Sequence, residues 1–98
     1  MPDRATGQTI ALRVLTQDRL AVEDTAVSIV APGEAGYLGI LRHHAPLVTT
    51  LGRGRLSWKR PDGASRSLQV DSGFLEVVRD RVTVLTTLTD EPEAVPHR

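Results

Sequence analysis

Two adjacent histidines, His43 and His44, are the residues of this sequence best suited to metal or acid–base chemistry. A metal site needs ligands that converge on one point, whereas neighbours in an extended segment project to opposite sides. The third histidine, His97, follows two prolines near the C-terminus. We therefore expect turn histidines bonded to backbone, and predict no metal ligand and no cofactor.

The nucleophiles and carboxylates give no stronger catalytic signal. The chain has no cysteine, and its serines lack the glycine-flanked turn and the nearby histidine base of a serine hydrolase. The acidic pairs Glu23–Asp24 and Asp90–Glu91 are expected to be solvated. We predict no catalytic residue and favour a binding or coupling role. A small hydrolase that uses His44 or Ser72 is kept as a remote alternative.

Three glycines at intervals of three, Gly33, Gly36 and Gly39, mark the segment 32–39. No Gly-Lys-Ser/Thr follows them, so the spacing does not match a phosphate-binding loop. We expect a loop in which glycine supplies a positive φ or a close backbone approach. Ligand binding by the glycine amides is the alternative.

Composition excludes several classes of protein. The formal net charge is zero, which gives no long-range attraction to nucleic acid or to anionic lipid. Tyr37, Trp58 and Phe74 are the three aromatic residues, too few for a base-stacking platform. No apolar run reaches the roughly 18 residues of a membrane span, and the N-terminus lacks the apolar stretch of a signal peptide. We therefore predict a cytoplasmic protein without direct lipid insertion.

Short runs with an alternation of apolar and polar residues predict the elements that position these side chains. Turn signals separate the runs, most clearly in the hairpin around Asp62–Gly63. Seven to ten short strands in 98 residues indicate an all-β sandwich or barrel. The expected organisation is a polar tail over 1–8, one β domain over 9–88, and an acidic tail over 89–98 that Pro92 and Pro96 keep from forming an uninterrupted helix. Strands are expected at 10–14, 20–22, 27–31, 37–41, 47–51, 55–59, 67–70, 74–78 and 82–88.

The same alternation assigns apolar side chains to both sides of the strands. Those expected to point inward are Leu12, Val14, Val27, Ile29, Leu56, Trp58, Leu68, Val70, Leu75, Val77, Val82 and Val84. Those left outward are Leu15, Val30, Phe74, Val78 and Leu85. Either these side chains form a surface for a partner, or β-bulges turn some of them back into the core, and the pattern leaves both alternatives open.

A longer motif carries a family resemblance. Gly33, Gly36 and Gly39–Ile40 are followed by His44–Ala45–Pro46–Leu47, and then by Gly73–Phe74 and Val82–Leu85. This order resembles the epsilon subunit of F-type ATP synthases, the homologue of the mitochondrial delta subunit, over residues 9 to 88. The resemblance implies a flattened β-sandwich of about ten strands.

The resemblance also implies a function. In this family the domain is a non-catalytic subunit of the central rotor stalk and couples the gamma subunit to the membrane-embedded c-ring during ion-driven ATP synthesis. It would lie peripherally, through the complex, on the cytoplasmic face of the bacterial inner membrane. By analogy, the c-ring-facing residues are Gly33, Glu34, Gly36, Tyr37 and Gly39. The gamma-facing residues are Thr16, His44 and Thr49.

One departure from the family pattern limits what is carried over. Family members usually continue with a C-terminal pair of antiparallel helices, which can inhibit ATP hydrolysis and in some members bind ATP. Here only the Pro-containing tail follows Leu88, so neither property is expected. The alternative outside this family is a free-standing β-sandwich that binds a small ligand, which requires a concave, aromatic-lined site.

Overall fold

The computed structural model describes residues 9–88 and 93–94, and its regular elements are all β-strands. The all-β prediction is therefore confirmed. The predicted tails, 1–8 and 89–98, lie outside the described residues except for Glu93–Ala94. The strands are β1 (Ile10–Leu15), β2 (Leu20–Ala26), β3 (Ser28–Gly33), β4 (Gly36–Leu41), β5 (Leu47–Lys59), β6 (Ser65–Val78), β7 (Arg81–Leu88) and β8 (Glu93–Ala94).

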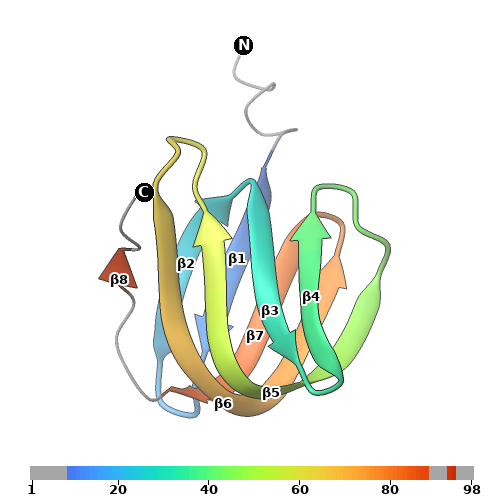
Figure 1. Cartoon of the computed structure of the whole chain (residues 1–98), viewed down its shortest axis with the longest axis vertical. Coiled ribbons are helices and arrows are strands. Elements are labelled where there is room, and N and C mark those ends of the chain that lie inside the picture. The colour runs from blue at the N-terminus through green and yellow to red at the C-terminus, as the bar shows by residue number, and fades with distance from the viewer. Residues whose placement is uncertain (1–8, 89–92, 95–98) are drawn as a thin grey trace.

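The strands form two layers that share their two longest members (Figure 1). The hydrogen-bonded order is β2-β1-β7-β6-β5-β3-β4, and β8 pairs with β6. β1 and β7 run parallel, whereas the other pairs are antiparallel. We call β2, β1, β7 and the adjoining halves of β6 and β5 the back layer. The front layer consists of β4, β3 and the other halves of β5 and β6.

The long hairpin β5–β6 curves from one layer into the other because its backbone bends where the sequence predicted breaks. In β6 the pairing with β7 shifts between Asp71 and Gly73, and Ser72 and Gly73 have φ of 61° and 135°. Such a β-bulge bends a strand without ending it. The expected break at 52–54 and the expected turn at 71–73 are therefore bends inside continuous strands, which is why the described residues form eight strands where about ten were expected.

The core between the layers is aliphatic apart from Trp58. Eleven of the twelve positions that the alternation assigned inward are buried. The exception is Val27, which is half-buried at the link between β2 and β3, while the neighbouring Ala26 is fully buried. Val27 N donates instead to the carbonyl of Lys59 at 2.8 Å, which ties this link to the end of β5.

Among the described residues, no helix has the length and apolar character that crossing a membrane requires.

Candidate interaction surfaces

The glycine segment 32–39 is a tight β-hairpin and not a loop. β3 extends to Gly33, β4 starts at Gly36, and only Glu34 and Ala35 form the turn. Two backbone features enforce this. Gly36 has φ of 141°, and a Cβ on Gly33 would lie 2.7 Å from both the carbonyl oxygen of Gly36 and a methyl group of Leu38. The predicted glycine chemistry is thus present at two of the three positions.

Gly39 was assigned the wrong role. Its φ is not positive, and a Cβ built on it would meet no atom within 4 Å. It occupies an ordinary strand position on the exposed face of β4, opposite Val30 of β3. The regular spacing of the three glycines concealed this difference, because only the first and second flank the turn.

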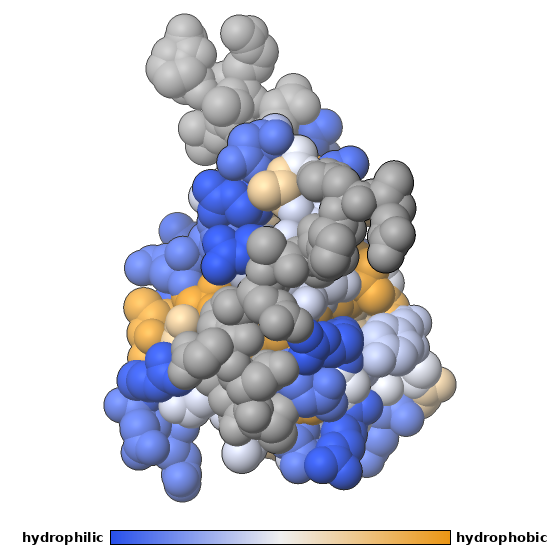
Figure 2. Space-filling view, turned by 60° about the vertical axis from the view of Figure 1, so that its left-hand side comes forward, coloured by the Kyte–Doolittle hydropathy of each residue, from blue (hydrophilic) through white to orange (hydrophobic). Residues whose placement is uncertain are grey.

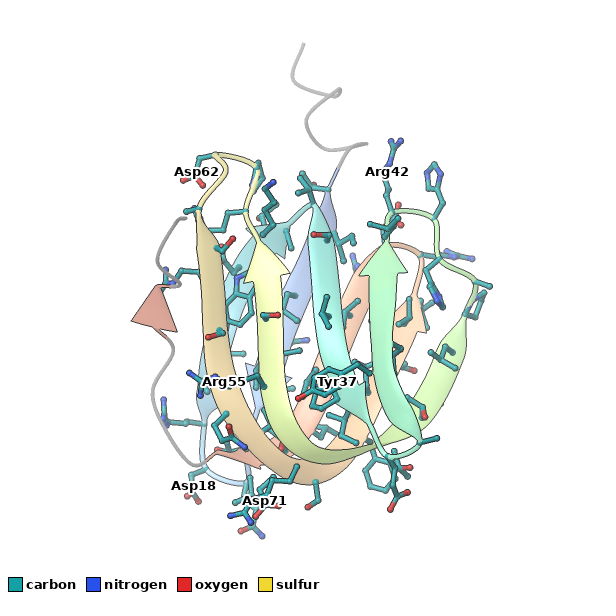
Figure 3. The ribbon with its side chains drawn as sticks, in the orientation of Figure 1. Asp18, Tyr37, Arg42, Arg55, Asp62 and Asp71 are labelled. Atoms are coloured by element: carbon teal, nitrogen blue, oxygen red, sulfur yellow. The ribbon has the colours of Figure 1, made fainter. Side chains whose placement is uncertain are left out.

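The hairpin tip is fixed to the start of β5. Glu34 N donates to the carbonyl oxygen of Thr50 at 3.1 Å, and the Thr50 hydroxyl donates to the Glu34 carboxylate at 2.7 Å. Tyr37 lies over β5 from the other side of the turn: the amide of Arg55 donates to its hydroxyl at 3.2 Å. A Cβ on Gly54 would be 2.5 Å from that hydroxyl, so Gly54 makes room for the phenol. Tyr37 is nevertheless 61% exposed (Figure 3).

The histidine segment 42–46 connects the two layers at the opposite end of the molecule from this hairpin tip (Figure 1). His43 has φ of 68°, and its amide donates to the Asp80 carboxylate at 2.5 Å. Its ring nitrogen Nε2 lies 3.8 Å from the same carboxylate. His44 N donates to the carbonyl of Leu41 at 3.1 Å, and His44 Nδ1 lies 2.7 Å from the carbonyl of Ala45. Both histidines therefore act in the turn, as the sequence indicated.

Thr16 organises the turn between β1 and β2, at the same end of the molecule as the glycine hairpin tip (Figure 1). Its hydroxyl accepts from the amides of Asp18 and Arg19 at 3.2 and 3.3 Å. Thr49 lies in the first half of β5, opposite Leu75. Thr16 and His44 are thus at opposite ends of the molecule, and the predicted gamma-facing residues form no single cluster. All three border the back layer.

An apolar strip crosses the outer face of the back layer. Leu20 pairs with Leu15, Leu15 with Leu85, and Leu85 with Phe74. Three of these side chains are exposed, Leu20 by 43%, Leu85 by 49% and Phe74 by 55%, and Leu15 is half-buried. The row ends at Thr50 of β5. The bulged-core reading of Phe74 and Leu85 is therefore wrong: these apolar side chains face outward and align across four strands.

The outer face of the front layer carries separate apolar residues. Val30, Tyr37 and Leu41 are exposed there, on β3 and β4. Figure 2, which looks at the molecule from the side where β8 lies, shows hydrophobic side chains at middle height on both flanks, with hydrophilic residues above and below. Val78, the remaining residue expected outward, is also exposed on β6.

A hollow of about 590 Å³ lies on the back layer beside the apolar strip. Charged residues of both signs line it: Arg13, Glu23, Asp24, Glu76 and Arg81. No aromatic residue is among its lining residues, so it does not meet the requirement of the small-ligand alternative. Within residues 9–88 and 93–94, no three histidine, cysteine or acidic side chains cluster in a way that could hold a metal ion.

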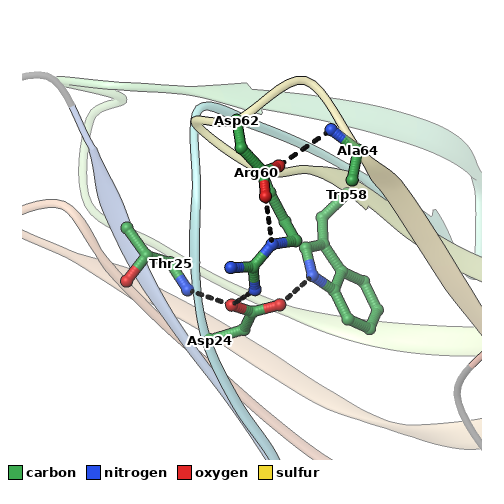
Figure 4. A network of polar contacts seen from close by, with 6 residues as sticks. All are labelled: Asp24, Thr25, Trp58, Arg60, Asp62 and Ala64. Atoms are coloured by element: carbon green, nitrogen blue, oxygen red, sulfur yellow. Dashed lines mark hydrogen bonds and ion pairs between the residues drawn. The ribbon is translucent and has the colours of Figure 1, made fainter.

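Sequence reasoning missed a polar network between the layers (Figure 4). Asp24, predicted to be solvated, has a side chain only 13% exposed. Its carboxylate accepts from Trp58 Nε1 and from Thr25 N, both at 2.8 Å, and from the Arg60 guanidinium. Burial by itself would raise the pKa of Asp24, but these donors together outweigh it, so the pKa is lowered. The carboxylate in turn raises the pKa of Arg60. Three donors hold this carboxylate in place, and its role is structural.

The positions of Ser72 and His44 do not support the small-hydrolase alternative. Ser72 lies in the bend of β6, where its carbonyl accepts from the Thr86 hydroxyl at 2.5 Å. That bend and the segment 42–46 with His44 lie at opposite ends of the molecule (Figure 1).

The fold and the apolar strip on its back layer define a β-sandwich interaction domain. Comparison with known proteins identifies the family. Residues 9–89 match the family model described as ATP synthase, Delta/Epsilon chain, beta-sandwich domain. The chain belongs to this family, which confirms the resemblance seen in the sequence.

Individual relatives agree with the family match. The chain is 40% identical over 89 residues to an ATP synthase epsilon chain of Koribacter versatilis, covering 91% of this chain and 62% of that protein. It is 37% identical over 84 residues to the epsilon chain of Moorella thermoacetica, covering 86% of this chain and 63% of that protein. The chain thus spans less than two thirds of the length of these relatives.

A solved structure shares the fold. A chain in the cryo-EM structure of the Euglena gracilis mitochondrial ATP synthase, OSCP/F1/c-ring, superposes with a TM-score of 0.77 and 25% identity, covering 91% of this chain and 54% of that one.

Proposed function

We propose that this domain is a non-catalytic subunit of the central rotor stalk of an ATP synthase, where it couples a gamma subunit to the membrane c-ring during ion-driven ATP synthesis. The observation that carries the proposal is the apolar strip on the back layer. Four apolar side chains aligned across four strands form a continuous surface that a partner can cover. Isolated exposed residues would not form such a surface.

The gamma subunit is assigned to the back layer. Thr16, His44 and Thr49 all border this layer, and the apolar strip crosses it from β2 to β6 at the end where Thr16 follows Leu15. A partner that contacts both ends of the layer must extend over its outer face, and the molecule measures 38 Å along its longest axis. An elongated shaft subunit fits this requirement.

The c-ring is assigned to the glycine hairpin. Gly33, Glu34 and Gly36 form or flank its tip, and Tyr37 and Gly39 follow on β4. The bonds from Glu34 and Thr50 hold the tip against β5, so a load applied there is transmitted to the long strand that runs through both layers. A rigid contact of this kind suits a joint under torque. In the assembled enzyme the subunit would lie at the cytoplasmic face of the bacterial inner membrane without entering the lipid.

Co-purification tests the proposal. The full chain, shown by circular dichroism to be a folded β protein, is expressed with an ATP synthase gamma subunit from the same organism and isolated through an affinity tag on gamma. We expect a stable complex of the two. A folded chain that never co-elutes with gamma at micromolar concentrations would contradict the proposal.

A further inference from the structure

Strand β4 is one edge of the sheet, and its outer side is available for pairing. Among the described strands it pairs with β3 alone. The two-residue turn makes Gly33 and Gly36 a hydrogen-bonded pair, and such pairs alternate along an antiparallel ladder. The main-chain groups of Tyr37 and Gly39 therefore point away from β3, and so does the amide of Leu41, whose carbonyl accepts from His44 N at 3.1 Å.

This edge has none of the features that normally prevent strand pairing. The six residues of β4 include no charge and no proline, and the β3–β4 register is uninterrupted. The opposite edge, β2, is different: it contains Glu23 and Asp24, and its register with β1 shifts between Val14 and Leu15. Long, uncharged and regular edges are those that accept another strand.

The sequence of β4 is complementary to itself about Gly39. In an antiparallel pair of two copies centred on this glycine, Gly39 faces Gly39 and each Tyr37 faces Leu41 of the second copy. Leu41 is 63% exposed and Tyr37 is 61% exposed, and the Tyr37 ring turns from its position over β5, where its hydroxyl accepts from the Arg55 amide, to make this contact. A Cβ on Gly39 would meet no atom within 4 Å, so the outer face of the sheet is unoccupied at the centre of the pair.

Charge also favours a second copy as the occupant. Glu34 precedes the strand and Arg42 follows it, with His43 and His44 next in the chain. The antiparallel arrangement brings the acidic end of each β4 beside the basic end of the other, and the two-fold axis makes this contact twice. Opposite charges across a strand pair stabilise it, whereas a parallel pair would place like charges together.

We propose that two copies of the free chain associate through antiparallel pairing of their β4 strands, centred on Gly39. Tyr37 and Gly39 contribute main-chain groups on the pairing side and Leu41 contributes its amide, so about four main-chain hydrogen bonds join the two front layers into one continuous sheet. The contact is small, and the dimer is accordingly weak, with a dissociation constant between about 10 µM and 1 mM. The pairing itself is independent of the proposed function. If the c-ring binds Tyr37 and Gly39, self-association and assembly exclude one another.

Sedimentation equilibrium of the full chain over a range of concentrations tests the pairing. Gly39→Pro removes the central donor but leaves the β3–β4 bonds, since the amide of Gly39 points outward. We expect it to raise the dissociation constant at least about tenfold. Gly39→Ala keeps the amide and adds a methyl group in open space, so it should leave the dimer within about threefold. A wild-type chain that is monomeric up to about 1 mM overturns the proposal.

A charge exchange identifies the occupant. Glu34→Arg and Arg42→Glu should each weaken the dimer, and the double variant should restore it, because only a two-fold pair of identical strands sees both changes at once. Val48→Lys, on the exposed side of β5 in the back layer, is the matched surface control and should have no effect. A dimer that tolerates Gly39→Pro, or that Val48→Lys abolishes, assembles through another face and overturns the proposal. Hydrogen exchange gives a further test. If the amides of Tyr37 and Gly39 are protected from exchange only when gamma or the c-ring is present, the proposal is also overturned.

Discussion

Trp58 Nε1 donates to Asp24 Oδ2 across 2.8 Å, and this bond joins the edge strand of the back layer to the middle of the front layer. Trp58 is buried and would otherwise have an unsatisfied donor. Asp24 would otherwise be a charge near the core without a partner. Together with Arg60, this pair links β2 to the end of β5, two segments that are not hydrogen-bonded neighbours in the sheet. It therefore holds the two layers together on that side of the sandwich.

Asp24→Asn should lower the free energy of unfolding by about 1–3 kcal/mol at pH 7, since hydrogen bonds to a charged group contribute more than neutral ones. The replacement keeps the shape of the side chain but removes the charge that faces Arg60. Urea unfolding followed by Trp58 fluorescence measures the change. Asp62→Asn is the control, because Asp62 is exposed and lies 3.6 Å from the same guanidinium. Equal effects of the two substitutions would contradict the structural role of Asp24.

The stability of the domain should also fall in acid because of Asp24. Its pKa is lowered in the folded state, so its contribution is complete above the ordinary aspartate pKa of about 4 and is lost as the pH falls through the lower folded value. Asp24→Asn should remove this part of the acid dependence. Unfolding free energies from pH 7 to pH 2, compared between wild type and variant, test it. Parallel curves would show that the acid sensitivity arises elsewhere.

Gly73→Ala should destabilise the domain by about 3 kcal/mol or more. Gly73 has φ of 135°, and a Cβ there would lie 2.0 Å from the carbonyl oxygen of Leu85. The bend of β6 therefore depends on glycine at this position. Denaturant unfolding gives the magnitude, and a variant as stable as wild type would mean that the bend can form another way.

Gly39→Val, in contrast, should leave the free energy of unfolding within about 1 kcal/mol of wild type or raise it, because valine suits an exposed strand position. From the sequence, a strong disturbance was expected here if Gly39 had a positive φ or touched a neighbouring backbone. The open space above Gly39 reverses that expectation. Thermal and urea unfolding, measured at concentrations where the chain is monomeric, distinguish these two outcomes.

The sequence predicted the features that depend on local patterns and missed those that depend on long-range strand pairing. Period-two alternation placed Val30, Phe74, Val78 and Leu85 outward, and all four are exposed, because the alternation is a property of each strand by itself. Their alignment into a strip could not be predicted. It requires β1 to lie parallel to β7, which brings Leu15 beside Leu85.

The candidate site shows the same division between features predicted from local sequence and features that depend on distant residues. The turn roles of His43 and His44 followed from local sequence, and so did the glycine requirement at Gly36. The partners of Asp24 did not, since Trp58 and Arg60 reach it from a strand far away in the chain. No short-range signal distinguishes a carboxylate on an edge strand from one in a solvated turn.

The apolar strip yields the most direct test of partner binding. Leu85→Glu with Phe74→Glu places two negative charges in the half of the strip on β7 and β6, where both side chains are about half exposed. The fold should tolerate them, because neither side chain reaches the core. If gamma covers this face, burying the charges should weaken its binding by a hundredfold or more, as expected for about 3 kcal/mol. Val30→Glu, at a similarly exposed position of the front layer, should leave gamma binding unchanged. Affinities from titration calorimetry with purified gamma distinguish the faces: a loss caused by Val30→Glu alone would place gamma on the front layer and leave the strip for another partner.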